Sequence, residues 1–175
     1  MIRIRLDENL SHKIAQAIRA LRIPSDVKIE SALEEKESGL SDVSWIELFT
    51  RRGGRCVLSG DGMMHYREPE RAALEAGGLV AIFVPVPRFW RPLRKWGQAA
   101  LILRWYPVIE IMARTAEPGS HWRIPPSFSP DITKLRPMAK VIRGGKQSPA
   151  PRGRKATPSP KGGALGLQPP PKAQK

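Results

Sequence analysis

An uninterrupted apolar segment, residues 79–84 (Leu-Val-Ala-Ile-Phe-Val), limits the possible folds of this chain most strongly. A strand that is apolar at every position has no side that faces water, which is typical of a parallel sheet with helices on both faces. Ile2, Ile4 and Leu6 form an earlier strand pattern, in which apolar residues alternate with arginines. Strand and helix patterns alternate along the chain, and this order predicts an α/β fold with a mainly parallel sheet.

The spacing of apolar residues, glycines and prolines places the other elements. Strands are predicted at residues 26–29, 56–58 and 121–124, the last of them at an edge of the sheet. Helices are predicted before Pro24 and at residues 42–52, 70–76 and 108–114. A further helix after Pro87 is expected to end at Pro107, with Trp96 in its buried stripe.

The net charge of +14 is unevenly distributed along the chain. All 16 acidic residues lie at or before Asp131, whereas ten lysines and arginines and no acid occur from Arg136 to the end. Pro, Gly, Lys, Ser and Ala dominate residues 144–175, and such a segment cannot bury enough apolar surface to offset its chain entropy. We therefore predict one folded domain at residues 1–135 and a disordered basic tail at residues 136–175.

The single cysteine, Cys56, excludes an intramolecular disulfide and a zinc site built from cysteines. It lies in an apolar run and is predicted to be a small buried hydrophobe. The first residues are too few and too charged for a signal peptide, and no apolar run approaches the ~20 residues of a membrane span. We expect a protein of the reducing cytoplasm.

Two of the strand patterns end in an aspartate, and this placement points to chemistry. Asp7 follows the first strand, Asp61 follows the strand at 56–58, and Asp42 stands at the start of a predicted helix between them. Strand ends in an open α/β sheet face one common crevice, so these carboxylates can converge. Converging carboxylates hold a hard divalent cation, and such a cation can drive phosphodiester hydrolysis. Without a cation, the crowded charges would repel one another.

Each acidic residue also has a purely structural interpretation, which stays open. Asp7 could belong to a turn, and Asp42 could cap its helix, a role compatible with binding a metal. Glu47 could complete a capping box. Asp61 lies between two glycines, which suit either a tight turn or the close approach of a ligand. Glu8 could be a ligand or an outer-shell group, since neighbouring side chains of an extended chain diverge.

Three segments resemble a known family in their order and spacing: residues 6–10 (LDENL), 41–46 (SDVSWI) and 57–61 (VLSGD). Over residues 1–125 the chain is similar to the PIN-like domains, compact PIN relatives found among ribonuclease toxins of the VapC type. The resemblance implies a three-layer α/β/α fold with a mainly parallel central sheet. It also implies a ribonuclease that depends on Mg²⁺ or Mn²⁺ and is usually paired with an antitoxin.

The same resemblance implies roles for particular residues. It carries catalysis and metal binding onto Asp7, Asp42 and Asp61. Glu8, which directly follows Asp7, is a further candidate metal ligand on the residues alone. Many relatives have a second acid two residues after the last aspartate, and this chain has Met63 there. The set of four acids is therefore incomplete at that position.

Basic residues near these acids are candidates for binding the RNA backbone. Arg67 and Arg71 follow Asp61, and Arg91 and Lys95 lie on the tryptophan-rich helix. A solvated helix face is the alternative interpretation. The charges of the tail would attract any polyanion without reading its sequence.

The predicted function is a cytoplasmic metal-dependent endoribonuclease, the toxin of a toxin–antitoxin pair. Water activated by Mg²⁺ would attack the RNA and leave a 5′-phosphate and a 3′-hydroxyl. The predicted partners are RNA and a cognate antitoxin, with no membrane, and a homodimer is compatible with the sequence. Two alternatives stay open: a non-catalytic nucleic-acid-binding module on the same fold, and a protein-interaction domain that docks a partner through the tryptophan-rich helix.

Overall fold

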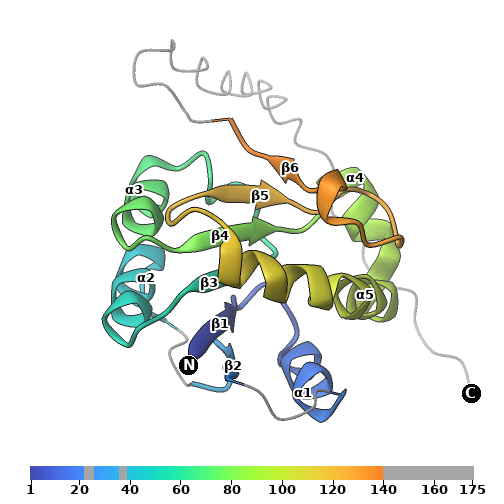
Figure 1. Cartoon of the computed structure of the whole chain (residues 1–175), viewed down its shortest axis with the longest axis horizontal. Helices are drawn as coiled ribbons and strands as arrows, with labels where there is room; N and C mark the ends of the chain where they lie inside the picture. Colours follow the sequence, from blue (N-terminus) through green and yellow to red (C-terminus); the bar gives the residue numbers. More distant parts are fainter. Residues whose placement is uncertain (22–25, 36–38, 140–175) are drawn as a thin grey trace, which may run out of the picture. The chain divides into compact units, whose positions relative to one another are not determined.

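The computed structural model describes residues 1–21, 26–35 and 39–139, which fold around a six-stranded sheet (Figure 1). The strands are β1 (Ile2–Leu6), β2 (Val27–Ser31), β3 (Cys56–Ser59), β4 (Val80–Phe83), β5 (His121–Arg123) and β6 (Arg136–Pro137). Their order is β2-β1-β3-β4-β5-β6, and every neighbouring pair is parallel except β5 and β6. The predicted α/β fold with a mainly parallel sheet is confirmed.

The helices connect these strands and cover the sheet. They are α1 (His12–Leu21), α2 (Asp42–Arg51), α3 (Glu68–Ala76), α4 (Pro87–Trp90) and α5 (Arg94–Thr115), with 3₁₀ turns at Arg91–Leu93 and Ile132–Lys134. Ser41 caps α2 by accepting from the backbone N–H of Ser44 at 3.2 Å. Asp42 is thus the first residue of α2 and leaves the cap to Ser41. Within the described part of the chain, no helix combines the length and the apolar character needed to cross a membrane.

Side chains on the central strands alternate between two cores, as the period of two in a strand requires. Cys56 and Leu58 of β3 belong to a core that also contains Trp105 of α5, whereas Val57 belongs to a second core with Phe49 of α2. Figure 1 shows α2 and α3 on one side of the sheet and α1 and α5 on the other. The result is the three-layer α/β/α arrangement that the resemblance implies.

Cys56 lies at the centre of the sheet. It pairs with Ile4 of β1 on one side and with Val80 of β4 on the other, and it is 0% exposed. Burial raises the pKa of its thiol to about 12. The prediction of a small buried hydrophobe is confirmed, and the thiol stays protonated at neutral pH.

Pro107 does not end a helix, contrary to the prediction of one helix before it and another at 108–114. It lies inside the 22-residue helix α5, which runs on to Thr115. Pro107 is exposed, whereas its neighbours Tyr106 and Val108 are buried. Proline cannot donate the usual backbone hydrogen bond, and here that bond is missing on the solvent side of the helix. The helix therefore continues past Pro107 along its packed side.

Trp96 is 90% exposed, so its predicted place in a buried stripe is wrong. The stripe assumed one straight helix from Phe89 onward. Instead the chain turns at Arg94, whose positive φ of 50° separates the 3₁₀ turn from α5. Apolar residues on the two sides of this turn belong to different helices, and the fully buried tryptophan of α5 is Trp105.

β6 extends the sheet past the predicted domain boundary at residue 135. Arg136 pairs with Arg123, and Pro137 pairs with Trp122, both antiparallel. β5 is consequently an internal strand and not the predicted edge strand. Residues 140–175, which hold most of the predicted tail, lie outside the described residues, as does Pro24.

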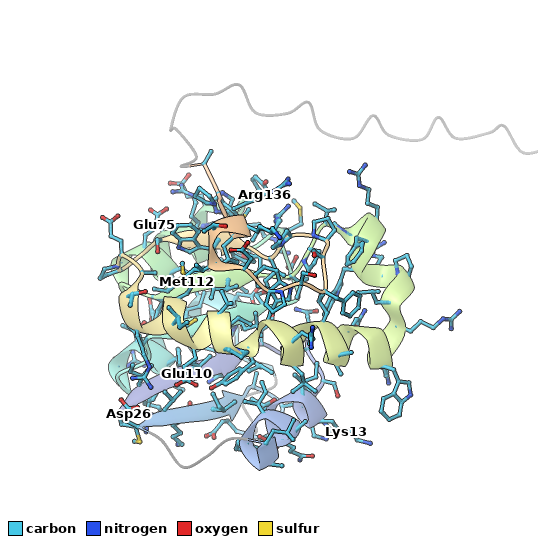
Figure 2. All side chains as sticks on the ribbon, turned by 45° about the vertical axis from the view of Figure 1, so that its right-hand side comes forward. Lys13, Asp26, Glu75, Glu110, Met112 and Arg136 are labelled. Atoms are coloured by element: carbon cyan, nitrogen blue, oxygen red, sulfur yellow. The ribbon has the colours of Figure 1, made fainter. Side chains whose placement is uncertain are left out.

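The last turn of α5 is tied to the start of β2 by an ion-pair network. Arg114 contacts Asp26 at 2.7 Å and Glu110 at 2.9 Å. Figure 2 labels Asp26 and Glu110 near the end of α5 that also carries the label of Met112. These exposed pairs each contribute little to stability.

Candidate active site

The carboxyl edge of the sheet carries the predicted acidic residues. Asp7 directly follows β1, and Asp61 lies two residues after the end of β3. Because β1 and β3 are parallel neighbours, both aspartates lie at the same edge. Asp42 opens α2, and Glu70 lies in the first turn of α3, the two helices that pack together on one face.

Asp7 is buried and surrounded by donors. It is 2% exposed, and the Ser59 hydroxyl donates a hydrogen bond to its Oδ2. The backbone N–H of Gly60 donates to the carboxylate at 3.1 Å, and that of Asn9 donates at 3.1 Å. A Cβ on Gly60 would lie 2.9 Å from the Cβ of Asn9, so only glycine lets the loop after β3 approach so closely.

Burial sets the protonation of Asp7. Loss of water raises its pKa to about 6, although the hydrogen bonds from Ser59 and Gly60 act in the opposite direction. At neutral pH this carboxylate is therefore charged but sensitive to its surroundings. A perturbed carboxylate at the edge of an α/β sheet is the kind of group found at functional sites.

Arg67 joins the other acidic residues. Its Nη2 contacts Asp61 Oδ2 at 2.5 Å, and its Nη1 contacts Asp42 Oδ2 at 3.3 Å and Glu70 Oε1 at 3.0 Å. These three carboxylates, from the β3 loop, α2 and α3, thus converge on one guanidinium. The hydrogen bonds that Arg67 donates to Glu70 and Asp61 raise the pKa of its guanidinium above the ordinary value.

The convergence on Arg67 shows that this place attracts a cation. Among residues 1–21, 26–35 and 39–139, no three His, Cys, Asp or Glu side chains lie close enough together to hold a metal ion in this conformation. The Arg67 side chain is 43% exposed, however, so solvent reaches it. The carboxylate oxygens that contact it are the ligands that Mg²⁺ prefers, so the chemistry of the donor set fits a hard divalent ion.

Sequence reasoning brought Asp7, Asp42 and Asp61 to this edge but did not single out Glu70. Glu70 lies in the first turn of α3, where the helix dipole favours an acid, and only its contact with Arg67 gives it a place in the cluster. Glu8 is exposed, and Met63, two residues after Asp61, is 56% exposed. Glu47 lies 3.9 Å from Arg51 on the surface of α2.

The four basic residues predicted to bind RNA lie in different surroundings. Arg67 belongs to the acidic cluster, whereas Arg71 is 8% exposed and pairs with Glu75 at 3.1 Å. Arg91 and Lys95 are exposed. Arg91 also lines a cavity of about 220 Å³, and Asp61 is another of its lining residues.

A buried pair of histidines lies near the site. The Nδ1 atoms of His65 and His121 are 2.7 Å apart, and His65 Nε2 lies 3.2 Å from the carbonyl of Ala139. If Nε2–H of His65 donates to that carbonyl, its Nδ1 accepts and His121 Nδ1–H donates. Burial lowers the pKa of both rings, that of His121 to about 4. No sequence signal announces this pair, because 56 positions separate its members.

One comparison with known protein families gave a match to the part of the chain that holds the first four strands. Residues 2–85 match the family model described as "PIN like domain", and this range contains Asp7, Asp42, Asp61, Arg67 and Glu70. Searches among curated proteins and among solved structures each gave no match.

Proposed function

We propose, from the match of residues 2–85 to the PIN-like domain model, that the chain is a metal-dependent endoribonuclease. PIN domains are generally nucleases, commonly use divalent metals and bind nucleic acids. We propose further that Asp7, Asp42 and Asp61 hold Mg²⁺ or Mn²⁺ and that Glu70 supplies the fourth carboxylate. Glu70 would then replace the acid that many relatives have at the position of Met63.

One observation carries the proposal: three carboxylates from three separate elements meet on the guanidinium of Arg67. Asp42, Asp61 and Glu70 each contact it within 3.3 Å. Such a cluster repels itself unless a positive charge fills it. Asp7 is linked to Asp61 through the Ser59 hydroxyl. This hydroxyl donates to Asp7 and accepts from the backbone N–H of Asp61 at 3.0 Å.

The residues of the site would divide the work between them. When bound, Mg²⁺ would polarise the scissile phosphate and lower the pKa of a water molecule. Asp42 and Asp61, both partly exposed, would be ligands of the ion that solvent can reach. Asp7 would ionise fully on meeting positive charge, since a cation lowers the pKa that burial has raised.

Arg67 would exchange partners during this process. In the absence of metal it neutralises the carboxylates, and on metal binding like-charge repulsion would drive it out of the cluster. The side chain starts beside the place where the phosphate would lie, and a guanidinium matches phosphate oxygens in a bidentate way. We therefore propose that Arg67 contacts the RNA backbone, together with the exposed Arg91 and Lys95.

The experiment is RNA cleavage with Mg²⁺ or EDTA by the full chain and by the variants Asp61→Asn, Asp7→Asn and Glu70→Gln. We expect cleavage only with metal, and a loss of about 100-fold or more in each variant, since each would remove a ligand or orienting charge. Mn²⁺ binding, followed by electron paramagnetic resonance, should weaken in the same variants. Glu117→Gln, an exposed acid beyond the end of α5, is the matched control and should behave as the wild type. Cleavage that survives in both aspartate variants would refute the proposal.

A non-catalytic nucleic-acid-binding module is the second candidate. It is favoured by Arg67, which already neutralises the acidic cluster, and by Met63, which cannot bind Mg²⁺. Tight RNA binding without metal-dependent turnover would support this candidate. If the nuclease is active, an antitoxin that restrains it in the cytoplasm is the expected partner. Co-expression of the chain with candidate antitoxin proteins tests for this partner.

A further inference from the structure

A cavity beside Asp61 has no role in the site described above. Its volume is about 220 Å³, and it lies between the loop after β3 and the segment that joins β4 to α4. Gly62, Tyr66, Pro85, Trp90, Arg91 and Arg123 are among its walls. Pockets for drug-sized ligands are larger, about 300–1,000 Å³, so this cavity suits one small planar group.

The walls of the cavity are mainly flat and apolar. Two aromatic residues line it, Tyr66, which is 53% exposed, and Trp90, which is 8% exposed. Prolines at positions 85 and 87 complete the lining. Surfaces of this kind bind nucleobases by stacking, which is how proteins hold the bases of single-stranded RNA.

Two arginines supply the polar part of the cavity. The Nε of Arg123 is buried and has no hydrogen-bond partner among the described residues. Its Nη2 lies so close to Gly62 that a Cβ there would be 3.2 Å away, so the guanidinium packs beside the loop that holds Asp61. Arg91 is exposed at the cavity, and no ion pair with a carboxylate of the described chain involves either arginine.

We propose that this cavity binds the nucleobase next to the scissile phosphate of a single-stranded RNA, with Tyr66 as its stacking partner and Arg123 as the residue that reads its edge. The proposal rests on the proposed nuclease function, because Asp61 belongs to both the cavity and the acidic cluster. A guanidinium has donors only, and guanine presents the acceptors O6 and N7 together. Guanine should therefore be preferred over adenine, whose edge carries an amino group.

The test measures binding of the RNA pentamers UUXUU, in which X is guanine, adenine, cytosine or an abasic site. Fluorescence anisotropy in EDTA keeps the RNA intact. We expect the guanine pentamer to bind roughly tenfold more tightly than the abasic one, a difference that one stacked base can supply. Tyr66→Ala should remove this advantage, and Tyr66→Phe, which keeps the ring, should retain it.

Arg123→Met should abolish the preference for guanine over adenine while leaving stacking in place. Arg104→Met is the matched control, because it removes one exposed positive charge from α5 outside the cavity lining. Melting curves establish that each variant is folded. If Arg123→Met does not fold, Tyr66→Ala still tests the proposal. Equal affinity for the abasic and guanine pentamers, or variants that match Arg104→Met, would overturn the proposal.

Cleavage of the same pentamers with Mg²⁺ separates this inference from the proposed function. Cleavage at equal rates for every X would leave the nuclease intact and eliminate the base-binding cavity. Guanine-selective binding without any cleavage would establish the cavity and eliminate the nuclease.

Discussion

The acidic residues of the site occupy two unlike environments. Asp7 is buried and receives hydrogen bonds only from uncharged groups, and its pKa is raised to about 6. Asp42 and Asp61 are partly exposed and share the guanidinium of Arg67. Both environments are costly for a bare carboxylate, but only the second already contains a positive charge.

This difference shows how one site can hold its charges before a metal arrives. The outer carboxylates are stabilised by a cation that belongs to the chain and can leave. The inner carboxylate depends on backbone and hydroxyl donors. Because these donors are uncharged, they compensate its charge less completely. The inner and outer acids should therefore respond in opposite ways when their charge is removed.

The largest expected effect is on stability. In EDTA at pH 8, Asp7→Asn should raise the free energy of unfolding by about 2–3 kcal/mol, because the charge that burial disfavours is gone. The Ser59 hydroxyl can accept from the new amide, and the N–H groups of Gly60 and Asn9 can donate to the oxygen that stays at the Oδ1 position. Asp61→Asn should instead lower stability slightly, through loss of its pair with Arg67. Urea denaturation measures both, and equal effects would remove the distinction.

The pH dependence sharpens the same comparison. The pKa of Asp7 is about 6 when folded and near 3.8 when unfolded, so its contribution to stability falls as the pH rises from 4 to 6. In metal-free wild type, denaturation at several pH values should show this contribution as the difference from Asp7→Asn. A difference that does not change with pH would contradict the burial argument.

The histidine pair should act with the opposite sign over nearly the same pH range. The pKa of His121 is about 4 when folded and near 6.5 when unfolded, so its contribution is present above pH 6.5 and is lost as the pH falls toward 4. Arg71 and Arg123 face the pair and oppose its protonation, whereas Glu75 favours it. His121→Gln should reduce the acid sensitivity by about 2 kcal/mol, and an unchanged acid limb in denaturation experiments would argue against the pair.

A smaller effect is expected at Arg67. Arg67→Met should destabilise the metal-free protein by about 1 kcal/mol or less, the usual contribution of exposed ion pairs, because three carboxylates lose their shared cation. The same variant should bind Mn²⁺ several-fold more tightly, since the metal no longer competes with a guanidinium. Thermal melting with and without Mn²⁺ tests both statements, and weaker Mn²⁺ binding would mean that Arg67 does not compete with the ion.

The smallest effect is expected at Trp96. Because this side chain is 90% exposed, Trp96→Ser should change the free energy of unfolding by less than about 0.5 kcal/mol. Trp105→Phe, at a fully buried position whose indole donates to the Ser127 carbonyl at 2.7 Å, is the contrasting control and should cost more. Similar losses in the two variants would indicate that another molecule covers Trp96.

Local patterns were sufficient for most of the sheet. The alternation at Ile2, Ile4 and Leu6 and the apolar run before Pro85 identified β1 and β4, because burial of a strand depends on its own residues. The predictions at Pro107 and Trp96 were wrong because the outcome at these positions depends on more than the local pattern. Whether a proline ends a helix, or a tryptophan enters a core, depends on which way the chain faces after a turn such as that at Arg94.

The sequence by itself determined that aspartates follow β1 and β3, and parallel pairing then required them to share one edge. Only the tertiary structure decided which partners these charges meet. The contact of Arg67 with Glu70, the burial of Asp7 and the pairing of His65 with His121 depend on where separate elements pack. A pattern along the chain records hydrophobicity at each position, whereas the energy of a charge depends on its neighbours in space.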